Sequence, residues 1–219
     1  MRRGEATMGR GQRKTQPHND VEETKRTILR TAQELFMEQG YRAVTTRQIA
    51  DACGLTQPAL YHYFADKEDL YIAVMQDELA QRKAALERIA QRNEHIEERL
   101  KQVVRYLLST AHRDHSLMLH DMRYELNEAV HDRMQTAFHD SIVAPIASIF
   151  AEGFQKGVLH DWRNCGVNAM MATYMLLSLL SSFLTMAYAE DAPTALHAER
   201  VETIVQVLLY GLVRPETHL

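Results

Sequence analysis

The sequence predicts an all-α protein with two parts, a small N-terminal domain built around a helix-turn-helix and a larger C-terminal helical domain. Three observations predict this fold. Apolar residues recur at helical spacing in one segment after another, without the alternation that marks a strand. Residues 45–64, TTRQIADACGLTQPALYHYF, have the pattern of two short helices around a glycine turn. Apolar residues make up 46% of the 219, which is ample for a core.

The helix-turn-helix prediction depends on where caps and breakers fall within residues 45–64. Thr45 and Gln48 stand three apart, the spacing of a capping box that begins a helix. Gly54 comes where the chain must reverse, because a positive φ costs little only for glycine. Thr56 is placed to cap the second helix, and Pro58 is tolerated in its first turn. The side chains of the second helix that we expect to face outward are Gln57, Ala59, Tyr61 and His62.

A further helix on each side is predicted to complete the N-terminal domain. The first runs from a cap at Asp20 to Gly40, with apolar residues at helical spacing. The other begins at a cap, Asp66, and extends toward Ala90, becoming polar as a connector between domains does. We therefore expect a disordered basic arm at 1–19, a helix-turn-helix domain at 20–66 and a connecting helix at 67–90.

Residues 91–215 are predicted to form the second domain from helices alone. The expected helices cover 96–108, 117–127, 129–152, 164–189 and 196–212. Pro145 is expected to kink the third of these, and Gly153 and Gly157 to mark its frayed end. The last two are long and adjacent, and the first of that pair is nearly free of charge.

Charge is unevenly distributed along the chain. The net charge is −4, but residues 1–70 carry 11 basic and 10 acidic side chains, whereas residues 71–219 carry 14 and 19. The N-terminal part is therefore the more positive one, and phosphate binding requires only a local basic patch. The arm carries Arg10, Arg13 and Lys14, which fit either contacts to nucleic acid or a solvated tail.

Composition favours a cytoplasmic protein. Two cysteines, Cys53 and Cys165, are too few for a disulfide framework, and the polar start lacks the apolar segment of a signal peptide. We expect reduced thiols, with a redox switch at an exposed thiol as the alternative. Residues 166–189 carry no charge and are long enough to span a membrane. Polar residues dilute this run, so we expect a buried helix and no membrane contact; a membrane-associated interaction protein is the alternative.

Residues 24–70 resemble the TetR (tetracycline-repressor) family of bacterial transcription regulators. The resemblance includes the alanine, glycine and leucine spacing of the helix-turn-helix, its L-Y-H-Y-F ending, and the D-K-E-D-L that follows at 66–70. The rest of the chain is similar to the family only in length and helical pattern. The resemblance implies a homodimer in which the last two long helices pair with those of a second subunit as a four-helix bundle.

A helix-turn-helix holds its second helix out to enter the major groove, so the motif predicts binding to double-stranded DNA. A two-fold dimer presents two such helices about 34 Å apart, which calls for a palindromic operator. Gln57 is the expected base reader, since its amide can pair bidentately with adenine, and Ala59 can touch a thymine methyl. Tyr61 and His62 resemble the family's phosphate and base contacts at the helix end. The other expected contacts, mainly to phosphate, are Thr45, Thr46, Arg47 and Lys67.

By the same resemblance, the second domain binds a small molecule that changes the spacing of the two reading helices and releases the DNA, as in a repressor. Methionine and aromatic side chains are frequent there and favour a largely apolar effector, although each also suits an ordinary core. The residues expected to contact the effector are Tyr106, Met118, Met122, Tyr124, Met134, Phe138, Met171 and Met175. An activator is a variant of this hypothesis.

Histidines are concentrated between residues 112 and 139, where five of the eleven fall: His112, His115, His120, His131 and His139. With nearby carboxylates they would supply metal ligands, so a metal-sensing regulator is an alternative, although no complete metal motif appears. The leading hypothesis includes no metal, no cofactor and no catalytic residue. An enzyme is disfavoured because neither a nucleophile elbow nor a phosphate loop is present.

Overall fold

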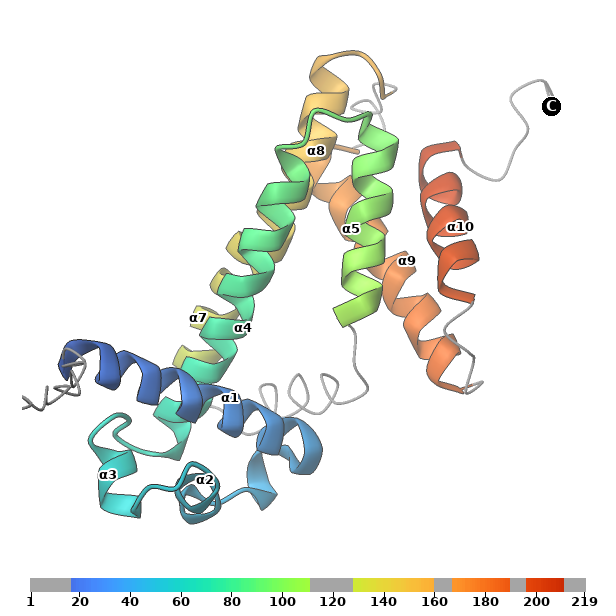
Figure 1. Ribbon diagram of the computed structural model, residues 1–219. Coiled ribbons are helices and arrows are strands. Elements are labelled where there is room, and N and C mark those ends of the chain that lie inside the picture. The colour runs from blue at the N-terminus through green and yellow to red at the C-terminus, as the bar shows by residue number, and fades with distance from the viewer. Residues whose placement is uncertain (1–16, 111–127, 160–166, 190–195, 211–219) are drawn as a thin grey trace, which may run out of the picture.

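The computed structural model describes residues 17–110, 128–159, 167–189 and 196–210, and every regular element within these ranges is a helix (Figure 1). The predicted all-α fold is confirmed. The N-terminal head contains α1 (Pro17–Ala43), α2 (Thr46–Ala52) and α3 (Gln57–Tyr61). The other helices are α4 (Lys67–Ala90), α5 (Ile96–Thr110), α7 (Glu128–Phe138), the π-helix η1 (His139–Val143), α8 (Ala144–Gln155), α9 (Ala169–Ala189) and α10 (Leu196–Tyr210). The first helix begins at Pro17, so Asp20 lies inside it and not at the predicted cap, and the last three residues of the predicted arm, 17–19, are helical. Residues 1–16 and the predicted helix at 117–127 lie outside the described residues.

The head packs its helices around one apolar cluster. Its fully or almost fully buried residues include Ile28, Ala32 and Phe36 of α1, Ile49 and Ala50 of α2, and Leu60 of α3. The rings of Phe36, Tyr41 and Tyr71 contact one another with centroids 4.8, 5.0 and 6.0 Å apart. Gly40 interrupts α1 with a φ of 78°, where the sequence predicts the helix end, and a short helical stretch continues to Ala43. The cluster thus fixes α2 and α3 against the two longer helices.

The long helix α4 belongs to both halves of the molecule (Figure 1). Leu70 and Val74, near its start, are buried in the head cluster, whereas Leu86 is buried in the C-terminal cluster. Gln33 of α1 donates from Nε2 to the Oε2 of Glu78 at 2.6 Å, which ties α1 to the middle of α4. A change in the tilt of α4 therefore moves the head relative to the C-terminal helices.

The predicted helix at 129–152 is helical throughout, and it contains a π-helix directly before Pro145. In η1 the N–H of Ala144 bonds the carbonyl of His139, five residues back. Pro145 follows directly, and proline disrupts an α-helix by removing an N–H and by crowding the carbonyl four residues back. The helix ends at Gln155, and Gly157 follows it with a φ of 67°, as predicted for its end. Gly153 instead lies buried within α8, where a Cβ would stand 2.6 Å from Leu159 Cδ1.

The C-terminal cluster joins α5, α8, α9 and α10. Its buried members include Leu100, Val103, Ile146, Phe150, Leu176 and Ile204. Arg99 of α5 is almost completely buried, and its Nη1 donates to the carbonyl of Ala90 at 2.7 Å and to Glu152 Oε2 at 2.8 Å. The guanidinium and its neighbour Lys156 lower the pKa of Glu152 to about 2. These contacts hold the end of α4 to α8.

The apolar helix α9 keeps one side uncovered in this chain. Leu176 and Leu180 face the C-terminal cluster, whereas Met171, Tyr174 and Met175 are 48%, 46% and 46% exposed. Across the described ranges, no helix combines the length and apolar character that crossing a membrane requires. An uncovered apolar face of this kind is typical of a contact surface with another protein.

Candidate nucleic-acid interface

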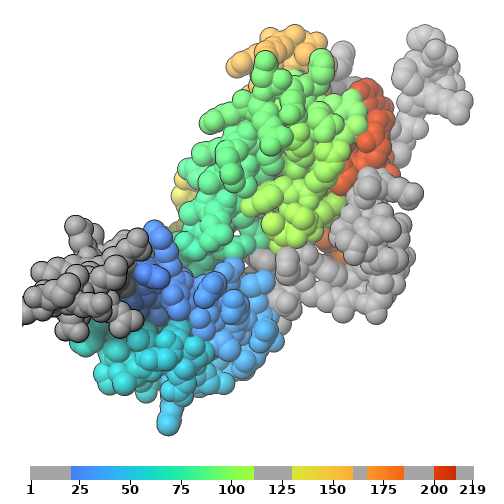
Figure 2. All heavy atoms as spheres, viewed as in Figure 1, coloured from blue at the N-terminus to red at the C-terminus, as the bar shows by residue number. Residues whose placement is uncertain are grey.

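The two short helices α2 and α3 form the outer end of the head, which projects as a lobe from the C-terminal helices (Figure 2). The capping box predicted at the start of α2 is present. Thr45 Oγ1 accepts the N–H of Gln48 at 3.2 Å, and the N–H of Thr45 donates to Gln48 Oε1 at 2.8 Å. The Thr45 hydroxyl also bonds Gln48 Oε1, so both side chains stabilise the helix start.

The turn and the second helix follow the predicted chemistry. Gly54 has a φ of 68°, and Thr56 Oγ1 accepts the N–H of Ala59 at 3.3 Å. Pro58 lies in the first turn of α3, and Leu60 is buried beneath it. Because Leu60 faces the head cluster, the opposite side of α3 faces solvent, as a recognition helix requires.

Three polar side chains join α2 to α3 on this outer surface. Gln57 Nε2 donates to Thr46 Oγ1 at 2.9 Å and to the Tyr61 hydroxyl at 3.4 Å. The Thr46 and Tyr61 hydroxyl oxygens are 3.2 Å apart and share a hydrogen bond. The sequence does not predict this arrangement, since only the spacing of four between Gln57 and Tyr61 indicates a contact. The structure therefore brings together three of the eight expected DNA contacts.

Lys67 lies at the start of α4, beside the head's aromatic cluster. Asp66 caps α4 by accepting the N–H of Asp69 at 2.8 Å. The Lys67 ammonium lies over the ring of Tyr41, 4.3 Å from its centroid. A cation–π contact of this kind restrains a flexible side chain. Tyr41, which the sequence does not single out, thus holds the charge of Lys67 at the edge of the head.

The other expected contacts are solvent-accessible residues of the same two helices. Arg47 is only loosely paired, with its Nε 3.9 Å from Asp51 Oδ2 and both side chains more than 70% exposed. His62 follows α3 directly and is exposed, and Ala59 is half-buried. Contact of these residues with DNA stays a prediction.

Cys53 ends α2 and is partly buried. Burial raises the pKa of its thiol, and a hydrogen bond with Thr31 opposes that shift only in part. Because the thiolate is the reactive form, a raised pKa makes this thiol less reactive. Cys53 therefore gives no support to a redox switch, and Cys165 lies outside the described residues.

The structure does not gather the residues predicted to contact an effector. Met134 is buried in the head cluster with Val130 of the same helix, and partly buried Tyr106 packs against the C-terminal cluster. Phe138 is 40% exposed. Met171 and Met175 belong to the uncovered face of α9, and Met118, Met122 and Tyr124 lie outside the described residues. Their contact with an effector stays a prediction.

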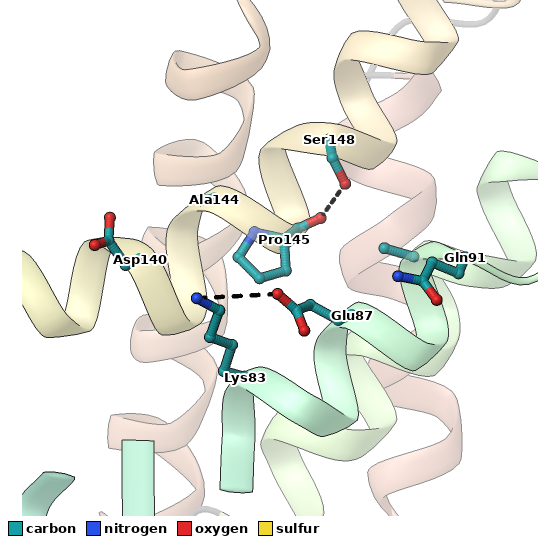
Figure 3. A pocket seen from close by; sticks show the side chains of 8 residues that line it. Lys83, Glu87, Gln91, Asp140, Ala144, Pro145 and Ser148 are labelled. Carbon is teal, nitrogen blue, oxygen red and sulfur yellow. Dashed lines mark hydrogen bonds and ion pairs between the residues drawn. The ribbon is translucent and has the colours of Figure 1, made fainter. Parts of the chain in front are cut away.

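A cleft of about 360 Å³ lies between α4 and the η1–α8 segment (Figure 3). It is lined by charged and polar side chains together with apolar surface, from Lys83, Glu87, Ala90, Gln91, Asp140, Ala144, Pro145 and Ser148. Lys83 and Glu87 face each other with nitrogen and oxygen 4.0 Å apart, and Ser148 donates to the carbonyl of Pro145. The cleft contains none of the residues predicted to bind an apolar effector.

Within the ranges that the structure describes, no three metal-binding side chains come together. His139 Nδ1 pairs with Asp140 at 3.1 Å, and His131 is half-buried on α7. The other three clustered histidines, His112, His115 and His120, lie outside the described residues. The metal-sensing alternative therefore gains no support from the described residues.

Comparison with known proteins relates the head to one family. The family model described as "Bacterial regulatory proteins, tetR family" matches residues 28–74. The transcriptional activator FasR of Mycolicibacterium smegmatis is 40% identical over 55 residues, which cover 25% of each protein. The chain thus spans about a quarter of the length of that relative.

Two longer similarities extend beyond the head. The transcriptional regulator UidR of Escherichia coli K12 is 25% identical over 174 residues, covering 78% of this chain and 85% of UidR. The structure of the regulator FadR from Bacillus subtilis, in complex with stearoyl-CoA, superposes with a TM-score of 0.69 at 20% identity. That superposition covers 86% of this chain and 99% of FadR, and at this identity it shows a shared fold.

Proposed function

Because the chain belongs to the TetR family of bacterial regulatory proteins, we propose that it is a transcriptional regulator that binds double-stranded DNA through α2 and α3. The observation that carries this proposal is the pair of capped short helices with a buried Leu60 and an outward polar face. That face carries hydroxyl, amide, imidazole and guanidinium groups within a few residues of one another. Such groups supply both phosphate contacts and base contacts in helix-turn-helix proteins. We place its action in the cytoplasm.

The regulator is proposed to act as a homodimer on a palindromic operator. The uncovered face of α9, with Met171, Tyr174 and Met175, supports this proposal because a single chain leaves it in water. Lys101 of α5 bridges Glu97 and Glu202 at 2.8 and 2.9 Å, which fixes α10 beside α5. A second copy related by a two-fold axis would cover the exposed face and present two recognition helices to one side of the DNA.

Release of the operator by a small, largely apolar effector is the proposed signal, which makes the protein a repressor. The FadR structure supports a ligand with a long apolar part, since it was solved with stearoyl-CoA, which carries an apolar acyl chain, and shares this fold. An effector acts only through a difference in its affinity for two conformations. The helix α4, buried in both clusters, is the element whose tilt such a ligand would change.

The test is selection of genomic fragments by the purified full-length protein, followed by sequencing, at several salt concentrations. The proposal predicts one enriched palindrome whose half-sites lie about one helical turn or slightly more apart. Binding that weakens steeply with salt and shows no enriched sequence would contradict a specific regulator.

A further inference from the structure

The three polar side chains that join α2 to α3 form a closed hydrogen-bonded triangle, which we call the hydroxyl triangle: Thr46, Gln57 and Tyr61. Thr46 is the first residue of α2, and Gln57 and Tyr61 are the first and last residues of α3. The spacing of four between Gln57 and Tyr61 places them on one face of α3. The triangle therefore spans the two helices on the surface proposed to meet DNA.

Counting hydrogens fixes the direction of these bonds. With Nε2 toward the hydroxyls, the amide donates to Thr46 Oγ1 at 2.9 Å and more weakly to the Tyr61 hydroxyl at 3.4 Å, and one hydroxyl hydrogen joins Thr46 to Tyr61. All three contacts are then satisfied, and one hydroxyl hydrogen is left over. With the amide reversed, two hydroxyl hydrogens would have to serve all three contacts. The orientation in the structure is the one that satisfies the triangle.

This arrangement limits what Gln57 can do to a base. Bidentate pairing with adenine requires that one amide both accept a hydrogen bond and donate one. In the triangle the amide nitrogen of Gln57 is directed at the two hydroxyls, so pairing with adenine would require it to give up its bond to Thr46. The hydrogen that remains belongs to one of the two hydroxyls, and Tyr61 is 45% exposed, so that hydrogen can reach a DNA oxygen.

We propose that Gln57 is a positioning residue, which holds the hydroxyls of Thr46 and Tyr61 together as one phosphate-binding unit and does not read adenine. Thr46 belongs to the first helix of the motif, which crosses the DNA backbone while the second helix enters the groove. A unit anchored on both helices therefore lies where the backbone meets the groove edge. The inference rests on the proposed DNA binding and concerns how that site works.

The experiment compares the full-length wild type with Gln57→Ala, Tyr61→Phe and the double variant, on the selected operator and on an unrelated duplex of the same length. Gln57→Ala should weaken binding to both duplexes by the same factor, about tenfold, because a phosphate contact carries no sequence information. Preferences at every operator position should stay unchanged. Because the two substitutions disrupt one unit, the double variant should bind about as weakly as the weaker single variant.

A second variant, Gln57→Glu, sharpens the test. Its carboxylate accepts both hydroxyl hydrogens and adds negative charge, so binding to both duplexes should fall further than in Gln57→Ala. A base reader would instead change its preference toward cytosine at one symmetric position. Thermal unfolding within a few degrees of the wild type, with Gln81→Ala as the matched control, separates these effects from loss of fold.

Two results would overturn the inference while leaving the proposed function intact. One is that Gln57→Ala loses affinity only for the operator and relaxes the preference at one symmetric base pair. The other is a double variant whose loss equals the product of the two single losses, which would show that the side chains act independently. A wild type that enriches no sequence would instead refute the proposed function, and with it the role assigned to the triangle.

Discussion

The head and the C-terminal helices are held in place by contacts of different range. In the head, Thr45, Thr56 and Asp66 each begin a helix by bonding an N–H three residues ahead. In the C-terminal half, Arg99 bonds Glu152 across 53 positions of the chain, Lys101 bridges to Glu202, and apolar residues far apart in sequence pack together. The difference explains why a short sequence motif predicts the proposed DNA surface, whereas no short motif predicts an effector site.

The largest effect is expected from truncating one buried isoleucine in each cluster, which tests whether the two halves unfold independently. Ile49 of the head and Ile146 of the C-terminal cluster are both fully buried. Replacing either with Ala should cost about 2–5 kcal/mol, since it removes buried carbon and leaves a cavity. Ile49→Ala should accelerate amide hydrogen exchange in α1–α3 and abolish operator binding. Equal acceleration in α5 and α9 would show that the two halves unfold as one unit.

A smaller effect tests the uncovered face of α9. Met175→Asp places a charge where the proposed second subunit would bury it, and Met175 is 46% exposed in the single chain, so the fold itself should survive. The dissociation constant of the dimer should rise by about a hundredfold or more. Sedimentation or light scattering measures this. A dimer as stable as the wild type would place the interface elsewhere.

Leu208→Asp is a less specific test of the same interface. Leu208 packs partly against the C-terminal cluster of its own chain, so a charge there would destabilise the fold as well as the dimer. The pair of variants therefore sharpens the comparison: Met175→Asp should change association alone, and Leu208→Asp should also lower the unfolding temperature.

Replacing Lys67 is expected to have a smaller effect than the substitutions at the interface. If its ammonium binds a phosphate, Lys67→Ala should weaken operator binding about tenfold. The slope of log affinity against log salt should fall by about one for each subunit, because each contact releases counterions. Lys83→Ala, on α4 but in the cleft beside α8, is the matched control and should leave both values unchanged. An unaltered salt slope in Lys67→Ala would remove Lys67 from the phosphate contacts.

The smallest effect is a pH dependence carried by Glu152. Arg99 first, and Lys156 second, hold the pKa of this carboxyl at about 2, below its value of about 4.3 in an unfolded chain. A depressed folded-state pKa contributes stability above the unfolded pKa, and that contribution is lost as the pH falls from about 5 toward 2. The unfolding temperature of Glu152→Gln should therefore fall less steeply over this window. If the unfolding temperatures of the wild type and Glu152→Gln fell in parallel with pH, the Arg99–Glu152 pair would not contribute to stability.

The sequence predicts most of the head because its signals act over three or four residues. The caps at Thr45 and Thr56, the turn at Gly54 and the buried Leu60 are all confirmed. The engagement of Gln57 with Thr46 could not be predicted, because it depends on how α2 and α3 are placed against each other. A base-reading role fits Gln57 as an isolated residue, and only the packing shows that its amide nitrogen is directed at Thr46 and Tyr61.

The C-terminal half was predictable only as a set of helices. Apolar spacing identifies a helix face but does not say which other element covers it. Met134 therefore lies in the head cluster, and Met171 and Met175 lie on the surface, although all three suit a pocket equally well by composition. The π-helix before Pro145 likewise depends on the backbone's response to one proline, which periodicity does not reveal.

The most direct test of the central proposal is a hydroxyl-radical footprint of the wild-type protein on its selected operator. A two-fold dimer with α3 in the major groove should protect two symmetric segments on one side of the duplex, centred about one helical turn or slightly more apart. Tyr61→Ala should weaken both segments together while the protein stays dimeric. A single protected segment, or uniform protection along the duplex, would contradict a dimeric helix-turn-helix regulator.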